Sequence, residues 1–312
     1  MFTALLQSKL VFVTGKGGVG KTTFSAALGM SNASEGRKTL LVEVDNFHSS
    51  LQSIFGLRPQ YKPTKINENL YCCNITWKEA LEDWLYQTIP IRRVSKMILS
   101  NQVAMLFLDA TPGARELVIL SKIIELTKTW DQVIVDLPAS GHALGILRVP
   151  ITALKMMKTG PIHQRASQMI SVFKSPTTRV VIVTLPEEMV INEAIEFWQK
   201  IDDEVPLSHK PIILLNRASF PSLSEEEKQL LHRIENRELS ELGKELVRAG
   251  RWDEDLEEGT KQALQRLKAF LGLDVFCFPR FGFLGGYKGG PTKLVNQLHS
   301  AIVRAVLKEV RK

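Results

Sequence analysis

A glycine-rich segment close to the N-terminus constrains this chain more than any other feature. It reads Gly15-Lys16-Gly17-Gly18-Val19-Gly20-Lys21-Thr22 and matches the pattern G-x-x-x-x-G-K-[S/T] in full. An apolar, β-branched run, Leu10–Thr14, precedes it, and a helix-like run, Thr22–Glu35, follows it. A strand, a loop of this composition and a helix in succession are typical of phosphate loops, so the segment predicts nucleotide binding.

Each residue type in this segment has a physical reason. Glycines allow backbone N–H groups to close around phosphate oxygens, because no Cβ atom stands in the way. The helix that begins near Lys21 directs the positive end of its dipole at the same anion. We expect Lys21 to neutralise the β- and γ-phosphates of ATP, the Thr22 hydroxyl to ligate Mg²⁺, and Thr23 to add a contact to the α-phosphate.

Apolar runs of strand length recur along the rest of the chain, with helix-like stretches between them. The runs are nearly continuous rather than alternating, which indicates strands covered on both faces. They are Leu10–Thr14, Thr39–Val44, Val133–Asp136, Val180–Leu185, Pro211–Asn216 and Val275–Pro279. The helix-like stretches are Thr22–Glu35, Glu187–Ile201 and Ser224–Gly250, and residues 59–70 and 217–225 have the composition of loops.

This alternation predicts an α/β fold of the P-loop NTPase kind, a doubly wound and mostly parallel sheet flanked by helices. Three stretches fit the alternation less well, near residues 78–130, 151–177 and 224–272, and are predicted to be helical insertions. No linker divides the sequence, so we expect residues 1–312 to form a single domain.

Composition and charge exclude several classes of protein. With 44% hydrophobic and 23% charged residues, the chain is not disordered, collagen-like or a disulfide scaffold. Its longest run without Asp, Glu, Lys or Arg is Thr22–Ser34, which is too short to span a bilayer. The start of the chain lacks the pattern of a secretory signal, and its three cysteines form no C-x-x-C pair. We therefore expect a cytoplasmic protein with unpaired thiols.

The basic residues are scattered along the chain. Lys and Arg number 40 and Asp and Glu number 33, so the formal net charge is +7. Because the basic residues do not run together, they favour a generic solvated surface over a nucleic-acid footprint. We do not expect a nucleic-acid partner.

The second lysine of the glycine-rich loop carries a resemblance to known proteins. The run from Gly15 to Thr23 resembles the deviant Walker A loop of MinD/ParA-type, nitrogenase-iron-protein-type and ArsA-type ATPases. In those families the extra lysine reaches across a dimer interface to the nucleotide of the partner. The resemblance therefore implies a homodimer that encloses ATP and Mg²⁺, with Lys16 stabilising the transferred charge in trans, as an arginine finger does.

Two further segments resemble the switches of the ArsA type. The first is Asp45-Asn46-Phe47-His48-Ser49, similar to D-P-A-H-S/N, although Asn46 and Phe47 depart from that pattern. By this resemblance Asp45 orients or activates the attacking water and contributes to the metal site.

The second switch-like segment is Asp136-Leu137-Pro138-Ala139-Ser140-Gly141-His142, which resembles D-T-A-P-T-G-H. The resemblance implies that Asp136 holds Mg²⁺ and that Gly141 contacts the γ-phosphate. His142 is either a structural histidine or a relay.

The resemblance also implies a base site. In the superfamily an Asn at the position of Asn216 reads the edge of adenine, and an amide that both donates and accepts suits that edge. Arg217 follows it directly. Later in the chain, Phe278-Pro279-Arg280 resembles the loop that packs on the base, so we expect Pro279 to be part of an ATP site.

These features predict a Mg·ATP-hydrolysing dimeric switch of the ArsA type, coupling dimer closure to a partner or client protein. Two alternatives stay open: a MinD/ParA-type positioning ATPase that acts on membrane or DNA, and an ATP-dependent ligase. There is no C-x-x-C pair for a zinc clasp, and one phosphate loop cannot supply the two fused halves of an arsenite pump ATPase. Cys72 and Cys73 are either small buried thiols or a metalloid site.

Two helical stretches admit two interpretations each. Ile151–Lys174 is rich in methionine and is either a client-binding groove or ordinary core packing. Leu294–Lys312 has an apolar side and a basic end, which suits either a peripheral membrane contact or a last helix packed on the sheet.

Overall fold

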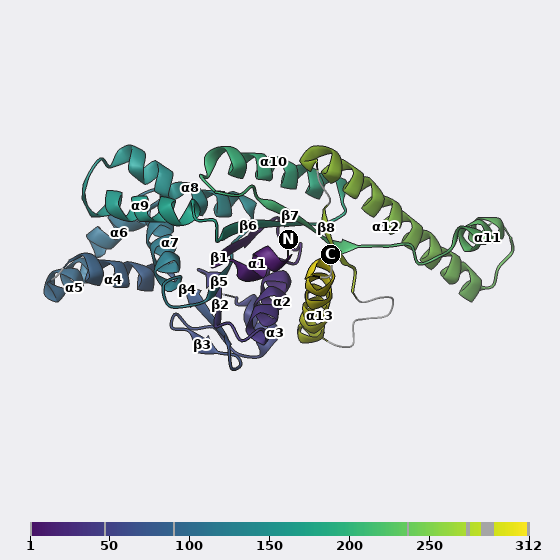
Figure 1. The fold of residues 1–312 in the computed structure, drawn as a ribbon, viewed down its shortest axis with the longest axis horizontal. Coiled ribbons are helices and arrows are strands. Elements are labelled where there is room, and N and C mark those ends of the chain that lie inside the picture. The colour runs from purple at the N-terminus through teal and green to yellow at the C-terminus, as the bar shows by residue number, and fades with distance from the viewer. Residues whose placement is uncertain are drawn as a thin grey trace.

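The structure, a computed structural model, describes residues 2–46, 48–89, 91–235, 237–272, 275–281 and 290–310. Its strands are β1 (Leu10–Thr14), β2 (Thr39–Val44), β3 (Thr64–Lys65), β4 (Leu70–Ile75), β5 (Gln132–Asp136), β6 (Thr178–Thr184), β7 (Ile212–Ala218) and β8 (Phe276–Pro279). They form one eight-stranded sheet in the order β3-β4-β2-β5-β1-β6-β7-β8 (Figure 1). Neighbouring strands run parallel, except that the short β3 is antiparallel to β4.

Helices cover both faces of this sheet. They are α1 (Phe2–Gln7), α2 (Lys21–Ser34), α3 (Ser50–Phe55), α4 (Trp77–Thr88), α5 (Arg92–Ser100), α6 (Gln102–Ala110), α7 (Ala114–Leu126), α8 (Ser140–Met156), α9 (Gly160–Phe173), α10 (Glu188–Glu204), α11 (Glu225–Glu235), α12 (Glu241–Leu271) and α13 (Gly290–Val310). α1, α2, α3 and α13 pack on one face, and α4, α7, α8, α9 and α10 pack on the other.

The sheet separates two apolar layers, and each central strand contributes to both. In β1, Leu10 and Phe12 face the layer with α7 and α9, while Val11 and Val13 face the layer with α2. All five residues of β1 are buried. Strands covered on both faces need apolar residues at every position, which is why their sequence runs do not alternate. The predicted doubly wound, mostly parallel α/β sheet is confirmed.

Three local predictions hold only in part. The stretch 59–70, expected as a loop, contains β3 and the start of β4, which is a sheet strand because it pairs with β2. The run 217–225 is a loop only after Ala218, where β7 ends. The segment Ser224–Gly250 is two helices rather than one. Ser240 caps α12 by accepting a hydrogen bond from the backbone of Gly243, and α12 then continues for 31 residues.

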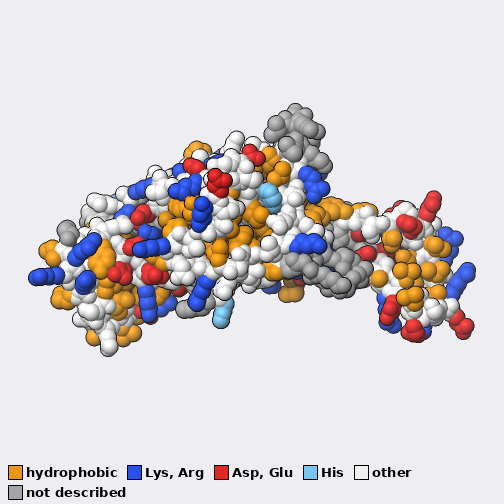
Figure 2. Space-filling model, turned by 90° about the horizontal axis from the view of Figure 1, so that it is seen from below, with side chains coloured by type: hydrophobic (Ala, Val, Ile, Leu, Met, Phe, Trp, Pro, Cys, Tyr) orange, Lys and Arg blue, Asp and Glu red, His pale blue; other side chains and the backbone are white. Residues whose placement is uncertain are grey.

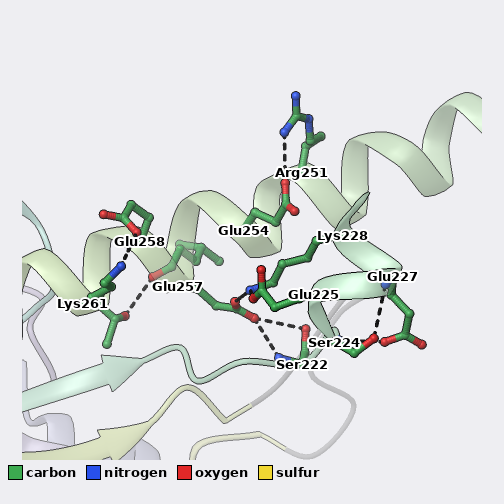
Figure 3. Close-up of polar contacts among 12 residues, drawn as sticks. Ser222, Ser224, Glu225, Glu227, Lys228, Arg251, Glu254, Glu257, Glu258 and Lys261 are labelled. Carbon is green, nitrogen blue, oxygen red and sulfur yellow. Dashed lines mark hydrogen bonds and ion pairs between the residues drawn. The ribbon is translucent and has the colours of Figure 1, made fainter. Parts of the chain in front are cut away.

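The two helices α11 and α12 form a hairpin that projects from one end of the molecule (Figure 1). Ion pairs hold its base together (Figure 3). Nζ of Lys228 on α11 lies 3.0 Å from a carboxylate oxygen of Glu257 on α12, and Glu257 also accepts a hydrogen bond from the backbone of Ser222 at 2.7 Å. These contacts fix the hairpin to the loop that follows β7.

Some of the apolar residues in the methionine-rich stretch Ile151–Lys174 pack inside the protein. Met169 and Phe173 of α9 are buried, and the ring of Phe173 meets that of Phe12 edge-on at 5.8 Å. The exposed large hydrophobic side chains of this stretch are Met156, at the end of α8, and Met157, directly after it. The core-packing interpretation is therefore the correct one for α9.

The last helix packs against the phosphate-loop helix. Val295, Leu298 and Ile302 of α13 are buried, and His299 shares a hydrogen bond of 2.9 Å with Ser31 of α2. A membrane contact through this apolar face would require α13 to leave α2. The basic end at Arg311 and Lys312 lies outside the described residues. In the part of the chain that the structure describes, no helix has both the length and the apolar character to cross a bilayer.

Candidate nucleotide site

The loop between β1 and α2 contains glycines in conformations that other residues rarely adopt. Gly15, Gly18 and Gly20 have φ angles of 140°, 81° and 97°. A Cβ atom on Gly15 would overlap the carbonyl oxygen of Val183 in β6, and one on Gly20 would lie 2.5 Å from Nδ2 of Asn216 in β7. Close approach to two strands therefore requires glycine at the first and last of these positions.

Other glycines of the site face open space. A Cβ atom on Gly17, Gly18 or Gly141 would meet no atom of the protein within 4 Å. Gly141 belongs to the first turn of α8, and the other two belong to the loop. The φ of 81° by itself favours glycine at Gly18. Packing within the protein does not explain why Gly17 and Gly141 lack side chains. A ligand that approaches the backbone closely would, and phosphate oxygens are such a ligand.

Lys21 and Thr22 begin α2 and connect the loop to β5. Nζ of Lys21 donates to the carbonyl oxygens of Gly15 at 3.2 Å and Lys16 at 3.0 Å. The Thr22 hydroxyl donates to Oδ2 of Asp136 at 2.5 Å. Burial lowers the pKa of Lys21, and the nearby charge of Asp136 opposes this effect. The structure thus brings the predicted Lys21, Thr22 and Asp136 together at the N-terminus of α2, where the helix dipole favours anions.

Asp136 ends β5 and fits a role as a ligand of Mg²⁺. Burial raises the pKa of its carboxyl group to about 7, although the hydrogen bond from Thr22 and the charge of Lys21 both act to lower it. Its Oδ1 atom is buried and has no hydrogen-bond partner, and an unpaired buried oxygen is costly unless a ligand satisfies it. Carboxylate and hydroxyl oxygens suit Mg²⁺, which when bound would neutralise charge on the β- and γ-phosphates.

Asp45 follows β2, at the same edge of the sheet. Its φ of 46° lies in the left-handed region, which aspartate tolerates better than most residues. Its backbone N–H donates to the carbonyl oxygen of Ile75 at 3.0 Å. Among the described residues, no three His, Cys, Asp or Glu side chains converge to hold a metal ion unaided. The roles of Asp45 in metal binding and water activation therefore stay predictions.

The loop after β2 is tied to β4 and α3. The backbone N–H of Asn46 donates to Oδ1 of Asn74 at 3.2 Å, and Nδ2 of Asn74 donates to the carbonyl oxygen of Asn46 at 2.7 Å. The Ser49 hydroxyl caps α3. Phe47, which departs from the switch pattern, lies outside the described residues. Paired amides thus hold the start of this loop against the sheet.

Lys16 is held by its own chain in this structure. Its Nζ atom lies 2.7 Å from Oε1 of Glu193, which belongs to α10, and the two side chains are 42% and 46% exposed. To reach the nucleotide of a second subunit, Lys16 would have to leave Glu193. The predicted action in trans stays a prediction.

The predicted base residues lie next to the phosphate loop. Nδ2 of Asn216 donates to the carbonyl oxygen of Val19 at 2.8 Å, and its Oδ1 accepts from the backbone of Arg217 at 3.0 Å. The Arg217 guanidinium donates to the carbonyl oxygen of Gly18 at 3.3 Å. Asn216 and Arg217 therefore fasten the loop to β7, whatever contacts they make with a base.

The segment expected to pack on the base is a strand end rather than a loop. Phe278 and Pro279 belong to β8, and Pro279 is in register with Ala218 of β7. Phe278 is buried, and its ring lies beside those of Phe2 and Phe24. Phe278 therefore packs in the core and not on a base.

The cysteines do not form a metalloid site. Cys72 and Cys73 are consecutive residues of β4, so their side chains point to opposite faces of the sheet, and each is buried in a different apolar layer. Burial raises the pKa of both thiols, which disfavours the thiolate that a metalloid would bind. The interpretation as small buried thiols is the correct one.

The sequence analysis missed two acidic residues of this site. The sequence could not predict that Glu193 lies at this site, because only the tertiary fold brings α10 next to the phosphate loop. Glu43 did leave a signal, since it is a charged residue inside the apolar run Thr39–Val44 and its side chain is buried. A charge within a strand covered on both faces is a sign of function that sequence reasoning could have used.

Known proteins share much of this chain. The sequence profile of a family described as anion-transporting ATPase matches residues 8–177, which include the loop, Asp45 and Asp136. ATPase BagA of Mycobacterium tuberculosis is 28% identical over 231 residues, which are 67% of this chain and 65% of BagA. A protein of Aquifex aeolicus whose name refers to an arsenical pump-driving ATPase is 33% identical over 147 residues, 45% of this chain and 48% of its own length.

The region of similarity has clear limits. The chain spans 65% of the length of BagA and about half of the Aquifex protein. The profile match ends at residue 177, before β6, so the hairpin of α11 and α12 and the helix α13 lie beyond it. The match nevertheless covers more than half of the chain, including the phosphate loop, Asp45 and Asp136. The chain belongs to the ArsA family of anion-transporting ATPases.

Proposed function

We propose that this chain converts ATP and water to ADP and phosphate with Mg²⁺, and that it works as a homodimeric switch whose ATP-bound form acts on a partner or client protein. One observation carries most of the weight. Lys21, Thr22 and Asp136 meet under a loop in which Gly17 and Gly18 face open space, and Asp136 keeps a buried oxygen without a partner. A phosphate chain with a bound cation would satisfy all of these groups at once.

Each residue of the site has a separate role in the proposed hydrolysis. The loop backbone and Lys21 would hold the phosphates, and Thr22 and Asp136 would hold the cation. Asp45 would keep the attacking water in line with the γ-phosphate. The backbone of Gly141 would contact the γ-phosphate and respond to its loss. Asn216, Arg217 and Pro279 would face the adenine.

The position of Lys16 supports the proposed dimer. In one subunit Lys16 is paired with Glu193 at the molecular surface, so it is not committed to its own phosphate site. A lysine that crosses to the second nucleotide would stabilise the charge that develops during phosphoryl transfer. ATP would then favour the closed dimer, and hydrolysis would release it.

An exposed apolar surface supports the proposal of a client protein. It lies at the opposite end of the molecule from the hairpin of α11 and α12. α6 has no buried residue, and its Val103 and Phe107 are 76% and 71% exposed. Met97 of α5 and Met156 of α8 are exposed as well. Figure 2 shows hydrophobic side chains on this end of the molecule. Flexible apolar side chains of this kind suit partners that are themselves apolar.

The test combines three variants with turnover, nucleotide binding and oligomeric state. Lys21→Ala should abolish ATP binding. Asp45→Asn should bind ATP normally but lower kcat by about 10²-fold or more, the range for a lost general base. Lys16→Ala should bind ATP, remain monomeric and lose about 10³-fold in kcat, the low end for a charge supplied in trans. Phosphate release, fluorescent-nucleotide titration and sedimentation velocity measure these quantities.

Exposed residues provide the controls. Lys128→Ala and Asp203→Asn remove the same charges elsewhere on the surface and should leave turnover unchanged. Normal turnover in Asp45→Asn would remove Asp45 from catalysis. An active Lys16→Ala monomer would refute the switch in trans while leaving ATP hydrolysis intact.

A further inference from the structure

Glu43 is a buried acidic residue that the proposed roles above do not use. Glu43 lies on β2, is only 1% exposed, and is in register with Asp136 of β5. Residues in register on neighbouring parallel strands point to the same face of the sheet. That face carries α2, so Glu43 and Asp136 lie side by side under the start of the phosphate-loop helix.

Both carboxylates keep one oxygen without a partner. Oε1 of Glu43 accepts a hydrogen bond from the backbone of Leu51 at 3.0 Å and a longer one from Asn46 at 3.4 Å. Oε2 of Glu43 and Oδ1 of Asp136 are buried and accept none. Buried polar atoms in folded proteins nearly always have partners, so two adjacent exceptions at one site call for a shared ligand.

The chemistry of the two groups identifies that ligand as a cation. Two carboxylates that lie side by side in a low-dielectric environment repel each other. A divalent cation with its water shell removes the repulsion and supplies hydrogen-bond donors to both free oxygens. Mg²⁺ in particular binds through one or two carboxylates together with phosphate oxygens and retained water.

We propose that Glu43 is a second carboxylate of the divalent-cation site and holds the water shell of the cation together with Asp136 and Thr22. This role rests on the proposed binding of Mg·nucleotide. Glu43 also accepts hydrogen bonds from Leu51 of α3 and from Asn46, which follows Asp45. Occupation of the cation site is thereby connected to the loop that carries Asp45.

The experiment measures how strongly Mg²⁺ improves ADP binding, without any need for turnover. A fluorescent ADP is titrated into the protein in EDTA and again in excess Mg²⁺, and the ratio of the two Kd values is compared between variants. Glu43→Gln keeps an oxygen for Leu51 but removes the charge. We expect it to bind ADP normally in EDTA and to lose about tenfold of the Mg²⁺ effect, the lower range for an outer-shell partner.

Two further variants provide comparisons, one with a larger expected effect and one with none. Asp136→Asn should lose more of the Mg²⁺ effect than Glu43→Gln does, and Glu196→Gln, an exposed glutamate of α10, should lose none. If Glu43→Gln does not fold, Glu43→Asp replaces it, because it keeps the charge but withdraws it by one methylene group. Glu43→Asp should lose part of the improvement that Mg²⁺ brings to ADP binding.

The outcomes are distinct. An unchanged Mg²⁺ effect in Glu43→Gln, or in Glu43→Asp where that variant is used, overturns the proposed role of Glu43. Weaker ADP binding already in EDTA also overturns it, because Glu43 would then only support the loop. Absence of ADP binding in the unaltered protein under both conditions would refute the proposed function itself.

Discussion

Gly15 and Gly17 stand two residues apart in the phosphate loop and are glycines for different reasons. Gly15 has a φ of 140° and approaches the carbonyl oxygen of Val183, so the fold itself excludes a side chain there. Gly17 has open space around its Cβ direction, so only a ligand would exclude one. A side chain at Gly15 should therefore reduce the stability of the protein, whereas a side chain at Gly17 should weaken nucleotide binding.

Alanine at each position should show this separation. Gly15→Ala should lower the free energy of unfolding by about 1–3 kcal/mol, the usual cost of a strained backbone, or more if β6 cannot move. Gly17→Ala should unfold like the unaltered protein but bind ATP at least about tenfold more weakly, because its methyl group occupies phosphate space. Urea denaturation and nucleotide titration measure the two effects. Equal loss of stability in both variants would contradict this explanation.

Among the elements, α10 determines where Lys16 rests. Its Glu193 forms an ion pair with Lys16 that is nearly half exposed, and exposed pairs contribute only about 0–1 kcal/mol. The pair therefore biases the position of Lys16 without locking it. ATP binding and dimer contacts need only exceed this small preference to move the lysine.

Removing the pair should favour the dimer slightly. In an Asp45→Asn background, which prevents turnover, Glu193→Gln should strengthen the ATP-dependent dimer by at most about fivefold, the equivalent of 1 kcal/mol. Sedimentation velocity at several protein concentrations measures the dimer Kd, and Glu196→Gln on the same helix is the control. A weaker dimer would mean that Glu193 belongs to the closed form instead.

At the scale of the whole molecule, two helical regions lie at opposite ends of the molecule (Figure 1). One contains α4, α5 and α6, and the other is the hairpin of α11 and α12. Both expose large apolar side chains, for example Phe107 on α6 and Leu242 on α12. Only the first region lies within residues 8–177, the part that the family profile matches. If the chain acts on a client protein, as proposed, we expect the client to contact α6 and not the hairpin.

This assignment predicts different results for two matched variants. Phe107→Ser and Leu242→Ser each remove one exposed side chain and should change stability by less than about 0.5 kcal/mol. With Asp45→Asn and ATP, proteins recovered by affinity capture should be lost with Phe107→Ser and retained with Leu242→Ser. Mass spectrometry identifies the recovered proteins. The reverse pattern would move client binding to the hairpin.

The sequence alone established the phosphate loop, the α/β class and most strands of the sheet. These features are local. The glycine spacing is set by the approach of backbone to phosphate, and a strand covered on both faces needs an unbroken apolar run such as Leu10–Thr14. Asp136 was predictable for the same reason, because a carboxylate that ends such a strand lies at the edge where the loop begins.

The tertiary structure was needed wherever the deciding contact joins distant segments. β4 is a strand because it pairs with β2, although the residues before it have the composition of a loop. Phe278 packs in the core because β8 joins the sheet beside β7. The register of β2 with β5 puts Glu43 beside Asp136, and the packing of α10 puts Glu193 beside Lys16. Such contacts depend on pairing and packing across many residues, which no local pattern encodes.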